Sequence, residues 1–401
     1  MGSNPTAPIG RLEFFSIAMK NLLFCYINPA TGHQQAAEAV MSAVRQVNPR
    51  VHTAGVNSIS YTHPVVGRLV SRLYMNVLKH TPQLWEALYD NPLIEEATRD
   101  VRDLLSFFSS RKIARLIKTH RPHAIVCTQA VPLNVLCALK ARGKLKIPLV
   151  GILTDYGVHS YWVSPSVDLY LVPTDEVRRK LARGGIRESR IKVTGIPVDP
   201  SFLARGNGRD ERSWLDLDPK RPVVLVMGGS HGLGPMEQVV GALRRLPGNV
   251  QVIVVCGSNR GLLKDLHKRF DEDPSIRLFG LTRLVPRLMG SADLLVSKPG
   301  GLTTAEALVK GLPMIILRPI PGQEEWNAAH LLRHGAAERA ETLEEMADAV
   351  QTLLADRERM ERMRKRCLSL ARPRAAYDAA DSLLSLIGET NIAVTPSSWP
   401  A

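Results

Sequence analysis

Short runs of apolar and β-branched residues alternate with helical stretches along this chain of 401 residues, and the alternation occurs twice. In the first half, an expected strand at Asn21–Ile27 precedes an expected helix at Gly32–Val47. In the second half, an expected strand at Pro222–Met227 precedes an expected helix at Met236–Leu246. Such alternation favours parallel sheets covered by helices. The sequence therefore predicts an α/β protein with two doubly wound, Rossmann-like domains, whose ligand sites at the carboxyl ends of the strands face a shared cleft.

The remaining expected elements repeat this pattern and set the domain boundaries. The further expected strands are Ala124–Cys127, Leu149–Leu153, Leu169–Val172, Ile191–Gly195, Val250–Cys256, Leu294–Ser297 and Met314–Leu317, and the further helices are Glu95–His120, Asp175–Arg183, Leu262–Phe270, Thr303–Lys310 and the tail Leu343–Leu386. Residues 19–203 form the expected first domain and residues 213–370 the second, joined by a charged, glycine-bearing linker at 204–212. Residues 1–18 and 389–401 are expected to be terminal extensions.

Positive charge is concentrated in the first half of the chain. Residues 1–200 hold 25 Lys and Arg against 14 Asp and Glu, a net charge of +11 out of +14 for the whole chain. A basic half suggests an anionic partner, either nucleic acid or a membrane surface, unless the chain is basic without a special partner. The sequence shows no zinc-finger spacing and no RNA-binding aromatic motif, so we expect an anionic membrane surface and no nucleic acid.

Composition and the cysteine pattern indicate in which cellular compartment we expect the protein. Hydrophobic residues make up 45% of the chain, and no apolar run reaches the roughly 20 residues needed to span a bilayer. The five cysteines are scattered and form no CxxC pair, which is typical of reduced thiols in a cytosol. Met1–Ala18 lacks the pattern of a secretory signal. We therefore expect a cytoplasmic protein that binds peripherally to the inner face of the cell membrane.

Two glycine-rich loops follow expected strands of the second half. Met227–Gly232 reads MGGSHG and Lys298–Glu306 reads KPGGLTTAE. Glycines let backbone N–H groups approach a phosphate closely, and a helix start adds a positive dipole. Either loop alone could be a structural turn, but the two together favour a nucleotide diphosphate. Glu306, one turn into the second helix, could cap that helix or accept hydrogen bonds from a ribose diol.

A third polar stretch, Pro321–Asn327, follows the expected strand Met314–Leu317. Its Gln323, Glu324 and Asn327 side chains suit the recognition of sugar hydroxyls. The alternative is a solvated turn with a helix cap.

Candidate catalytic groups lie in the first half. His33 begins the first expected helix, and an imidazole with an unperturbed pKa of about 6.5 suits proton abstraction from an alcohol. The helix start disfavours the imidazolium form, although His33 could also be a simple cap. In the stretch TDYGVHSYW, Asp155 and His159 could reach the same cleft, and Trp162 could contact a lipid or close the cleft. Asp155 could equally cap a helix.

The segment Pro64–Tyr89 interleaves apolar and basic residues. Arg68 and Arg72 alternate with apolar side chains, and Trp85 follows in the same segment. Apolar and basic faces of this kind suit an anionic bilayer surface, but they also occur where a helix packs on a core and exposes a solvated face.

From Cys25 to Ala336, the chain resembles the glycosyltransferase family 28 enzymes that make glycosyldiacylglycerols, namely the plant-type monogalactosyldiacylglycerol synthases and the bacterial processive diacylglycerol β-glucosyltransferases. The matching stretches are Gly32-His33 with Ala36-Ala37, Leu153–Trp162, Val193–Phe202, Met227–Gly232, Lys298–Glu306 and Gly322–Asn327. The resemblance implies a GT-B fold, with the acceptor on the first domain and the UDP-sugar on the second. It also implies that the C-terminal helix, at residues 371–388, crosses back onto the first domain.

The resemblance assigns roles to individual residues. His33 matches the proposed catalytic base of the family, and Glu306 is expected to hold the ribose hydroxyls. Residues expected near the diphosphate are Gly229, Ser230, His231, Gly300, Gly301 and Thr303, and those expected at the hexose are Gln323 and Glu324. The uracil is expected to meet the backbone at Phe279-Gly280. The first loop, NPATGH, departs from relatives that carry a turn richer in glycine or serine.

The expected reaction is an inverting transfer of a hexose from a UDP-sugar to the hydroxyl of diacylglycerol, which gives a β-glycoside. His33, or Asp155 directly or through water, takes the hydroxyl proton. The KPGG and PGQE forms of the loops look more like the bacterial glucosyl enzymes, so glucose is favoured over galactose. No cofactor or metal is expected, because Asp216-Leu217-Asp218 lies away from the diphosphate loops.

Three alternatives remain open from the sequence. One is another GT-B transferase with a polyprenyl-linked acceptor of the lipid II type. A second is a UDP-N-acetylglucosamine 2-epimerase, which needs no acceptor. The third is a catalytically silent UDP-sugar sensor at the membrane.

Overall fold

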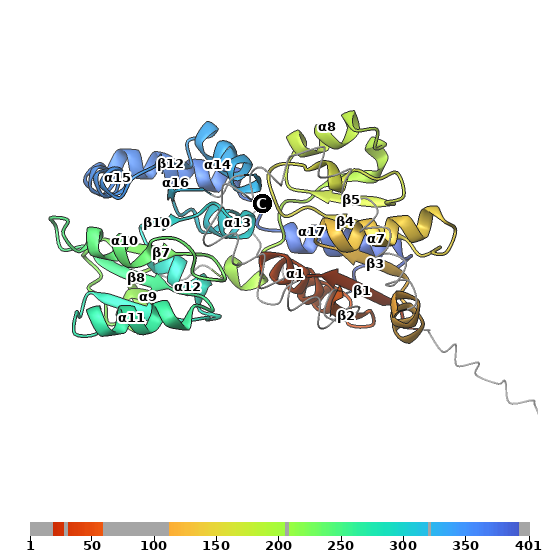
Figure 1. The fold of residues 1–401 in the computed structure, drawn as a ribbon, viewed down its shortest axis with the longest axis horizontal. Helices are drawn as coiled ribbons and strands as arrows, with labels where there is room; N and C mark the ends of the chain where they lie inside the picture. The colour runs from red at the N-terminus through yellow and green to blue at the C-terminus, as the bar shows by residue number, and fades with distance from the viewer. Residues whose placement is uncertain (1–18, 28–30, 59–111, 205–207, 320–321, 393–401) are drawn as a thin grey trace, which may run out of the picture.

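The computed structural model describes residues 19–27, 31–58, 112–204, 208–319 and 322–392. The segment 64–89 with Arg68, Arg72 and Trp85 lies outside the described residues, as do residues 1–18 and most of the expected helix Glu95–His120. The described residues form two six-stranded parallel sheets, one from each half of the chain (Figure 1). The predicted α/β class with two doubly wound halves is confirmed.

The first sheet has the strand order β2-β1-β3-β4-β5-β6. Its strands are β1 Asn21–Tyr26, β2 His52–Asn57, β3 Ala124–Cys127, β4 Leu149–Ile152, β5 Leu169–Val172 and β6 Ile191–Val193, and its helices include α1 Gly32–Val47, α7 Ala130–Ala141 and α8 Asp175–Arg183. Every residue of β3, β4 and β5 is buried, as expected for central parallel strands covered on both faces. The strand order reverses between β1 and β3, and the loop that follows β1 leads to His33.

The second sheet has the strand order β12-β11-β10-β7-β8-β9. Its strands are β7 Val223–Met227, β8 Gln251–Val255, β9 Ile276–Phe279, β10 Leu294–Ser297, β11 Met314–Leu317 and β12 Ala337–Ala340, and its helices are α10 Met236–Leu243, α11 Arg260–Phe270, α12 Val285–Ser291, α13 Gly301–Lys310, α14 Gln323–Arg333, α15 Leu343–Ala355 and α16 Arg357–Leu370. The order reverses between β7 and β10. Both glycine-rich loops begin at the carboxyl ends of these two strands, which is where ligands bind in such sheets.

Three strands that the sequence did not predict lie at sheet edges. β2 ends the first sheet, and β9 and β12 end the second. Their side chains are mostly partly exposed, and β12 reads AERA. Edge strands need no continuous apolar run, so the signal that identified the central strands is missing from them.

The expected linker at 204–212 differs from the structure in its second half. Residues from Gly208 onward belong to helix α9, Gly208–Trp214. Arg212 of this helix forms an ion pair with Asp293 at 2.7 Å and donates to the carbonyl of Ser291 at 2.8 Å. The charged residues thus attach a short helix to the second half, where the sequence indicated a free connection.

The C-terminal helix α17, Ala375–Leu386, packs against α1 of the first half, and Figure 1 shows it in blue among the elements of that half. Tyr377 donates its hydroxyl to Gln46 of α1 at 2.7 Å. The chain reaches α17 through Arg372, which lies close to Gly195. A Cβ at Gly195 would lie 2.5 Å from that of Arg372, and the residue has φ +95°, so only glycine allows this crossing.

Candidate active site

The strand order reverses between β1 and β3 in the first sheet and between β7 and β10 in the second. The N-terminus of α13, which follows β10, approaches the first half. A Cβ at Gly301, the first residue of α13, would clash with the carbonyl oxygen of Thr154, directly after β4. A Cβ at Gly32, at the start of α1, would lie 3.4 Å from that of Leu302. The glycine-rich second loop therefore seats the start of α13 directly against the loops that carry His33 and Asp155.

His33 lies in the first turn of α1, with a partly exposed side chain. Its Nδ1 is 3.0 Å from the hydroxyl oxygen of Thr154, and its carbonyl accepts a hydrogen bond from Thr128 at 2.8 Å. If Nδ1 carries the proton and donates to Thr154, the lone pair of Nε2 is available to accept another. Desolvation lowers the pKa of His33, and the nearby Asp155 carboxylate partly opposes this. The imidazole is therefore neutral at neutral pH, as a general base requires.

Asp155 is the neighbour of His33 that matters most electrostatically. Desolvation raises the pKa of its carboxyl group, while His33 and a hydrogen bond from Asn327 act in the opposite direction. Asn327 Nδ2 donates to Asp155 Oδ1 at 2.9 Å. The structure thus brings together the two predicted catalytic residues, and it adds a partner from the second half.

Asn327 points toward the first half, although it was predicted to contact the sugar. Its Oδ1 accepts from the backbone N–H of Tyr156 at 2.8 Å, and its Nδ2 also donates to the carbonyl of Pro299 at 2.9 Å. Its neighbour Trp326 packs against Gly157, where a Cβ would clash with the indole ring. The start of α14 therefore closes directly onto the loop that follows β4.

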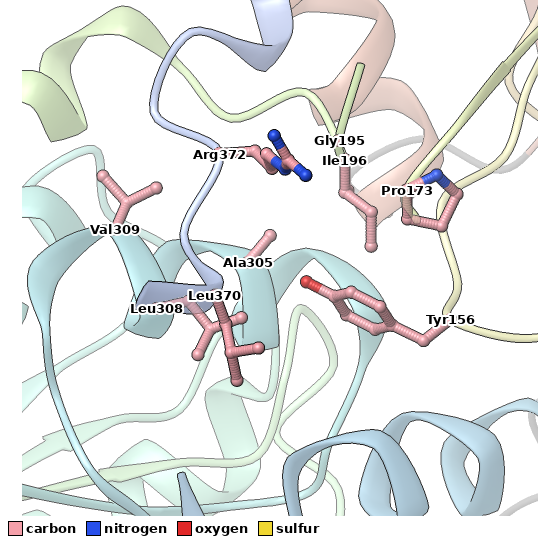
Figure 2. A pocket seen from close by; sticks show the side chains of 9 residues that line it. All are labelled: Tyr156, Pro173, Gly195, Ile196, Ala305, Leu308, Val309, Leu370 and Arg372. Carbon is pink, nitrogen blue, oxygen red and sulfur yellow. The ribbon is translucent and has the colours of Figure 1, made fainter. Parts of the chain in front are cut away.

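Tyr156, in the loop after β4, contacts both α14 and a pocket between the two halves. Its ring stacks on His330 of α14 at 4.1 Å between centroids. Its hydroxyl points into a small pocket (Figure 2). The lining residues are Tyr156, Pro173, Gly195, Ile196, Ala305, Leu308, Val309, Leu370 and Arg372. This pocket lies where the chain crosses between the halves, since Gly195 and Arg372 of the crossing are among its lining residues.

The first glycine-rich loop is held by the loop after β8. Gly229 has φ +67°, and a Cβ there would meet no atom within 4 Å, so its backbone borders open space. Ser258 donates both its N–H, at 2.9 Å, and its hydroxyl, at 3.0 Å, to the carbonyl of Ser230. His231 Nδ1 lies 3.1 Å from the same hydroxyl. Gly300, the N-cap of α13, also borders open space. These glycines leave room for a ligand at the carboxyl ends of β7 and β10.

Glu306 is a buried acid without a partner among the described residues. Its side chain is only 8% exposed, and no hydrogen bond or ion pair links it to the described part of the chain. Burial, with a smaller effect from Asp199, raises its pKa to about 8. A buried carboxyl group without hydrogen bonds is unfavourable unless it serves a ligand or remains protonated.

The residues predicted to hold the hexose lie in the first turn of α14. The Oε1 atom of Gln323 is buried and has no hydrogen-bond partner among the described residues. Glu324 forms an ion pair with Lys298 at 2.6 Å, and both side chains are largely buried. Lys298 belongs to the second glycine-rich loop, so this pair joins that loop to the start of α14.

The other predicted site residues are more dispersed. Thr303 lies in the first turn of α13, and Phe279 ends β9 just before Gly280. Trp162 packs against the core of the first half, and His159 accepts a hydrogen bond from the N–H of Tyr161 at 3.2 Å.

Sequence reasoning missed Thr154, Lys298 and the direction of Asn327. All three residues lie inside motifs that the sequence analysis had identified, so the motifs themselves were the available signal. Their partners were hidden, because each contacts an element more than twenty residues away.

Two general features of the described residues bear on the site. No group of three or more His, Cys, Asp or Glu side chains in this part of the chain is arranged to hold a metal ion. Among the described helices, none combines the length and the apolar character that crossing a bilayer requires.

Sequence comparisons cover both halves. The family described as Monogalactosyldiacylglycerol (MGDG) synthase matches residues 33–198, and the Glycosyltransferase family 28 C-terminal domain matches residues 223–382. A protein of Bacillus licheniformis named processive diacylglycerol beta-glucosyltransferase is 30% identical over 357 residues, which cover 88% of this chain and 91% of that protein.

Comparisons with solved structures agree on the fold. MurG of Acinetobacter baumannii has a TM-score of 0.59 at 16% identity, covering 91% of this chain and 99% of that chain. HepE of Anabaena, solved in complex with UDP-glucose, has a TM-score of 0.54 at 15% identity, covering 91% of this chain and 99% of that chain. These similarities confirm the predicted GT-B-like arrangement of two Rossmann-like halves.

We predict that Lys298→Met lowers the free energy of unfolding by about 3 kcal/mol, because it leaves the Glu324 carboxylate buried without its cation. A double-mutant cycle with Glu324→Gln, measured by urea denaturation, should give a coupling energy above about 1 kcal/mol. The control is the more exposed pair between Arg339 of β12 and Glu325 of α14, with side chains 35% and 41% exposed, which should couple by less than about 1 kcal/mol. Equal coupling in the two cycles would contradict a special role for the buried pair.

Proposed function

This chain belongs to glycosyltransferase family 28, among the processive diacylglycerol β-glucosyltransferases, and on this premise we propose that it transfers a glucosyl group from UDP-glucose to the hydroxyl of a diacylglycerol. The observation that carries the proposal is the placement of a neutral imidazole beside the start of α13. His33 and Asp155 lie against this helix start. Gly300, the N-cap of the helix, and Gly229, in the first glycine-rich loop, both border open space. A proton acceptor and a diphosphate cradle are thus neighbours.

The donor is proposed to bind to the second half. Backbone N–H groups at Gly229 and Gly301 are suited to the diphosphate, since they lie in a glycine turn and at a helix start. Gly300 borders open space beside them, and its own N–H donates to the carbonyl of Lys298 at 3.0 Å. Glu306 receives the ribose hydroxyls, and the unpartnered Oε1 of Gln323 receives a hydroxyl of the hexose. Lys298 orients Glu324 beside it. These assignments place a ligand hydroxyl beside the Glu306 carboxyl group and beside Gln323 Oε1, neither of which has a hydrogen-bond partner among the described residues.

The remaining donor contacts follow from the loops around these groups. Ser230, His231 and Thr303 are assigned to the diphosphate, and the backbone at Phe279-Gly280 to the uracil. We assign the diphosphate charge in the transition state to backbone amides and to the α13 dipole, so the proposed reaction uses no metal ion.

The chemical step begins at the acceptor hydroxyl. His33 Nε2 takes the proton as the hydroxyl oxygen attacks the anomeric carbon from the face opposite UDP. The bond from that carbon to the diphosphate oxygen breaks, and UDP leaves with the electron pair. Asp155 stabilises the imidazolium that forms, and Thr154 holds the Nδ1 proton. Attack from the opposite face converts an α-linked donor into a β-glucoside.

Incubation of the protein with diacylglycerol and either UDP-glucose or UDP-galactose, followed by mass analysis of the lipids, tests this function. We expect β-glucosyldiacylglycerol from UDP-glucose. The variant His33→Ala should lower turnover by about 10²–10⁴-fold and leave UDP binding intact, because a general base contributes this much. Absence of a lipid product from wild-type protein, or full turnover by the variant, would contradict the proposal.

Glu306 gives a pH-dependent test of the ribose contact. Its carboxyl group, with a pKa of about 8 in the free protein, is largely protonated at pH 6, whereas ribose hydroxyls favour the ionised form that accepts their hydrogen bonds. Binding therefore releases a proton, and affinity for UDP-glucose should rise from pH 6 to pH 8 and then level off.

Calorimetry of UDP-glucose binding in two buffers of different ionisation enthalpy measures this proton release. Glu306→Gln serves as the control, with weaker binding and no proton release from this site. Equal affinity and equal proton release in wild-type protein and variant would rule out the ribose assignment.

The membrane contact is a separate part of the proposal. The net charge of +11 in residues 1–200 suits an anionic leaflet, which the protein would bind peripherally on the cytoplasmic side. Arg68, Arg72 and Trp85 are the proposed contacts, with Trp162 and His159 near the acceptor. Double replacement of Arg68 and Arg72 by Glu should reduce co-sedimentation with anionic vesicles, and salt should weaken wild-type binding. Equal binding to anionic and zwitterionic vesicles would contradict this part.

A further inference from the structure

The amide side chain of Asn327 hydrogen-bonds to both halves of the protein at once. It is fully buried, at 0% exposure, just after the first turn of α14. Its Nδ2 donates to Asp155 Oδ1 and to the carbonyl of Pro299, each at 2.9 Å, and its Oδ1 accepts from the N–H of Tyr156 at 2.8 Å. One side chain therefore joins the loop after β4, the second glycine-rich loop and the helix that carries Gln323 and Glu324.

We propose that Asn327 is a positioning residue of the proton-accepting pair, which holds Asp155 beside His33 and ties this arrangement to the diphosphate loop through Pro299. The inference rests on the function proposed above. It differs from the sequence-based expectation, in which Asn327 contacts the sugar together with Gln323 and Glu324.

The hydrogen-bond inventory of the amide favours positioning over sugar contact. An asparagine side chain has two N–H donors and one carbonyl oxygen. Both donors of Asn327 are used by protein acceptors, and its oxygen already accepts from a backbone N–H. A sugar hydroxyl that sought a donor here would have to displace a buried hydrogen bond. Gln323, whose Oε1 has no partner among the described residues, is the side chain with capacity for a hydroxyl.

The electrostatic consequence is transmitted through Asp155. An N–H donated to a carboxylate favours its ionised form, and an ionised Asp155 in turn raises the pKa of His33. The other titratable groups around this cluster are Tyr156 on the same loop, His330 stacked on it, and the Lys298–Glu324 pair. Loss of the Asn327 donor leaves Asp155 less ionised and less firmly held, and both changes make His33 a weaker base.

The test compares Asn327→Ala, Asp155→Asn and the double variant. If Asn327 acts through Asp155, Asn327→Ala lowers kcat by about 10²-fold, the loss expected when a catalytic group is misplaced by about 1 Å. The KM for UDP-glucose should stay within about 3-fold of wild type. In the Asp155→Asn background, Asn327→Ala should change kcat by less than about 2-fold, because the residue through which it acts is already lost.

A second readout does not depend on turnover. Titration of His33 by NMR with labelled histidine should show a lower pKa in Asn327→Ala and in Asp155→Asn, with little further change in the double variant. The matched control is Asn48→Ala, which removes another fully buried amide, one that donates to the carbonyl of Thr390 at 2.8 Å far from this cluster. It should lower thermal stability while leaving kcat and the pKa of His33 unchanged.

Two results would overturn the inference. One is a raised KM for UDP-glucose with unchanged kcat and an unchanged pKa of His33, which would return Asn327 to the sugar. The other is fully additive effects of the Asn327 and Asp155 variants on kcat and on the pKa of His33. Transfer by wild-type protein and by the Asn48 variant reports on the proposed function independently, so failure of either idea can be recognised separately.

Discussion

The site depends on the close approach of the α13 N-terminus to the loop after β4. At Gly301 the helix backbone meets the carbonyl of Thr154 with no room for a Cβ atom. The same glycine belongs to the loop assigned to the diphosphate, and Thr154 precedes Asp155 and faces His33. Because Gly301 is both the first residue of α13 and the point of contact between the halves, the proposed diphosphate loop and the proposed proton acceptor are held at a fixed distance from each other. Asn327 and Trp326 extend this contact across the next helix.

Buried polar groups without protein partners mark the other side of the same site. Glu306 is buried and has no hydrogen bond to a described residue. Gln323 Oε1 is also buried and has no hydrogen-bond partner among the described residues. Such groups are destabilising in a packed core, and these two lie on α13 and α14, the helices that follow β10 and β11, so they argue for ligand hydroxyls as their partners. By contrast, Lys298 and Glu324 satisfy one another, which suggests that this pair shapes the site as well as contacting the ligand.

The sequence was sufficient for the central architecture and for which motifs matter. Continuous apolar runs identified β3, β5, β10 and β11 to the residue, because central parallel strands are buried on both faces. Edge strands such as β2 and β12 carry polar residues and lack that signal. The direction of the Asn327 side chain could not be predicted, since its partner Asp155 lies in the other half and an amide near the start of a helix can equally face a ligand. Contacts between side chains of the two halves depend on how the two domains are oriented, and the hydrophobic periodicity of the sequence carries no information on that orientation.

A crystal structure of the protein with bound UDP-glucose tests the central claim most directly. The account predicts diphosphate oxygens within hydrogen-bonding distance, about 3 Å, of the N–H groups at Gly229 and Gly301, with the anomeric carbon on the side of His33 Nε2. It also predicts that Asn327 keeps its hydrogen bond to Asp155 in that complex. A diphosphate bound away from these two loops, or an anomeric carbon that faces away from His33, would contradict the account.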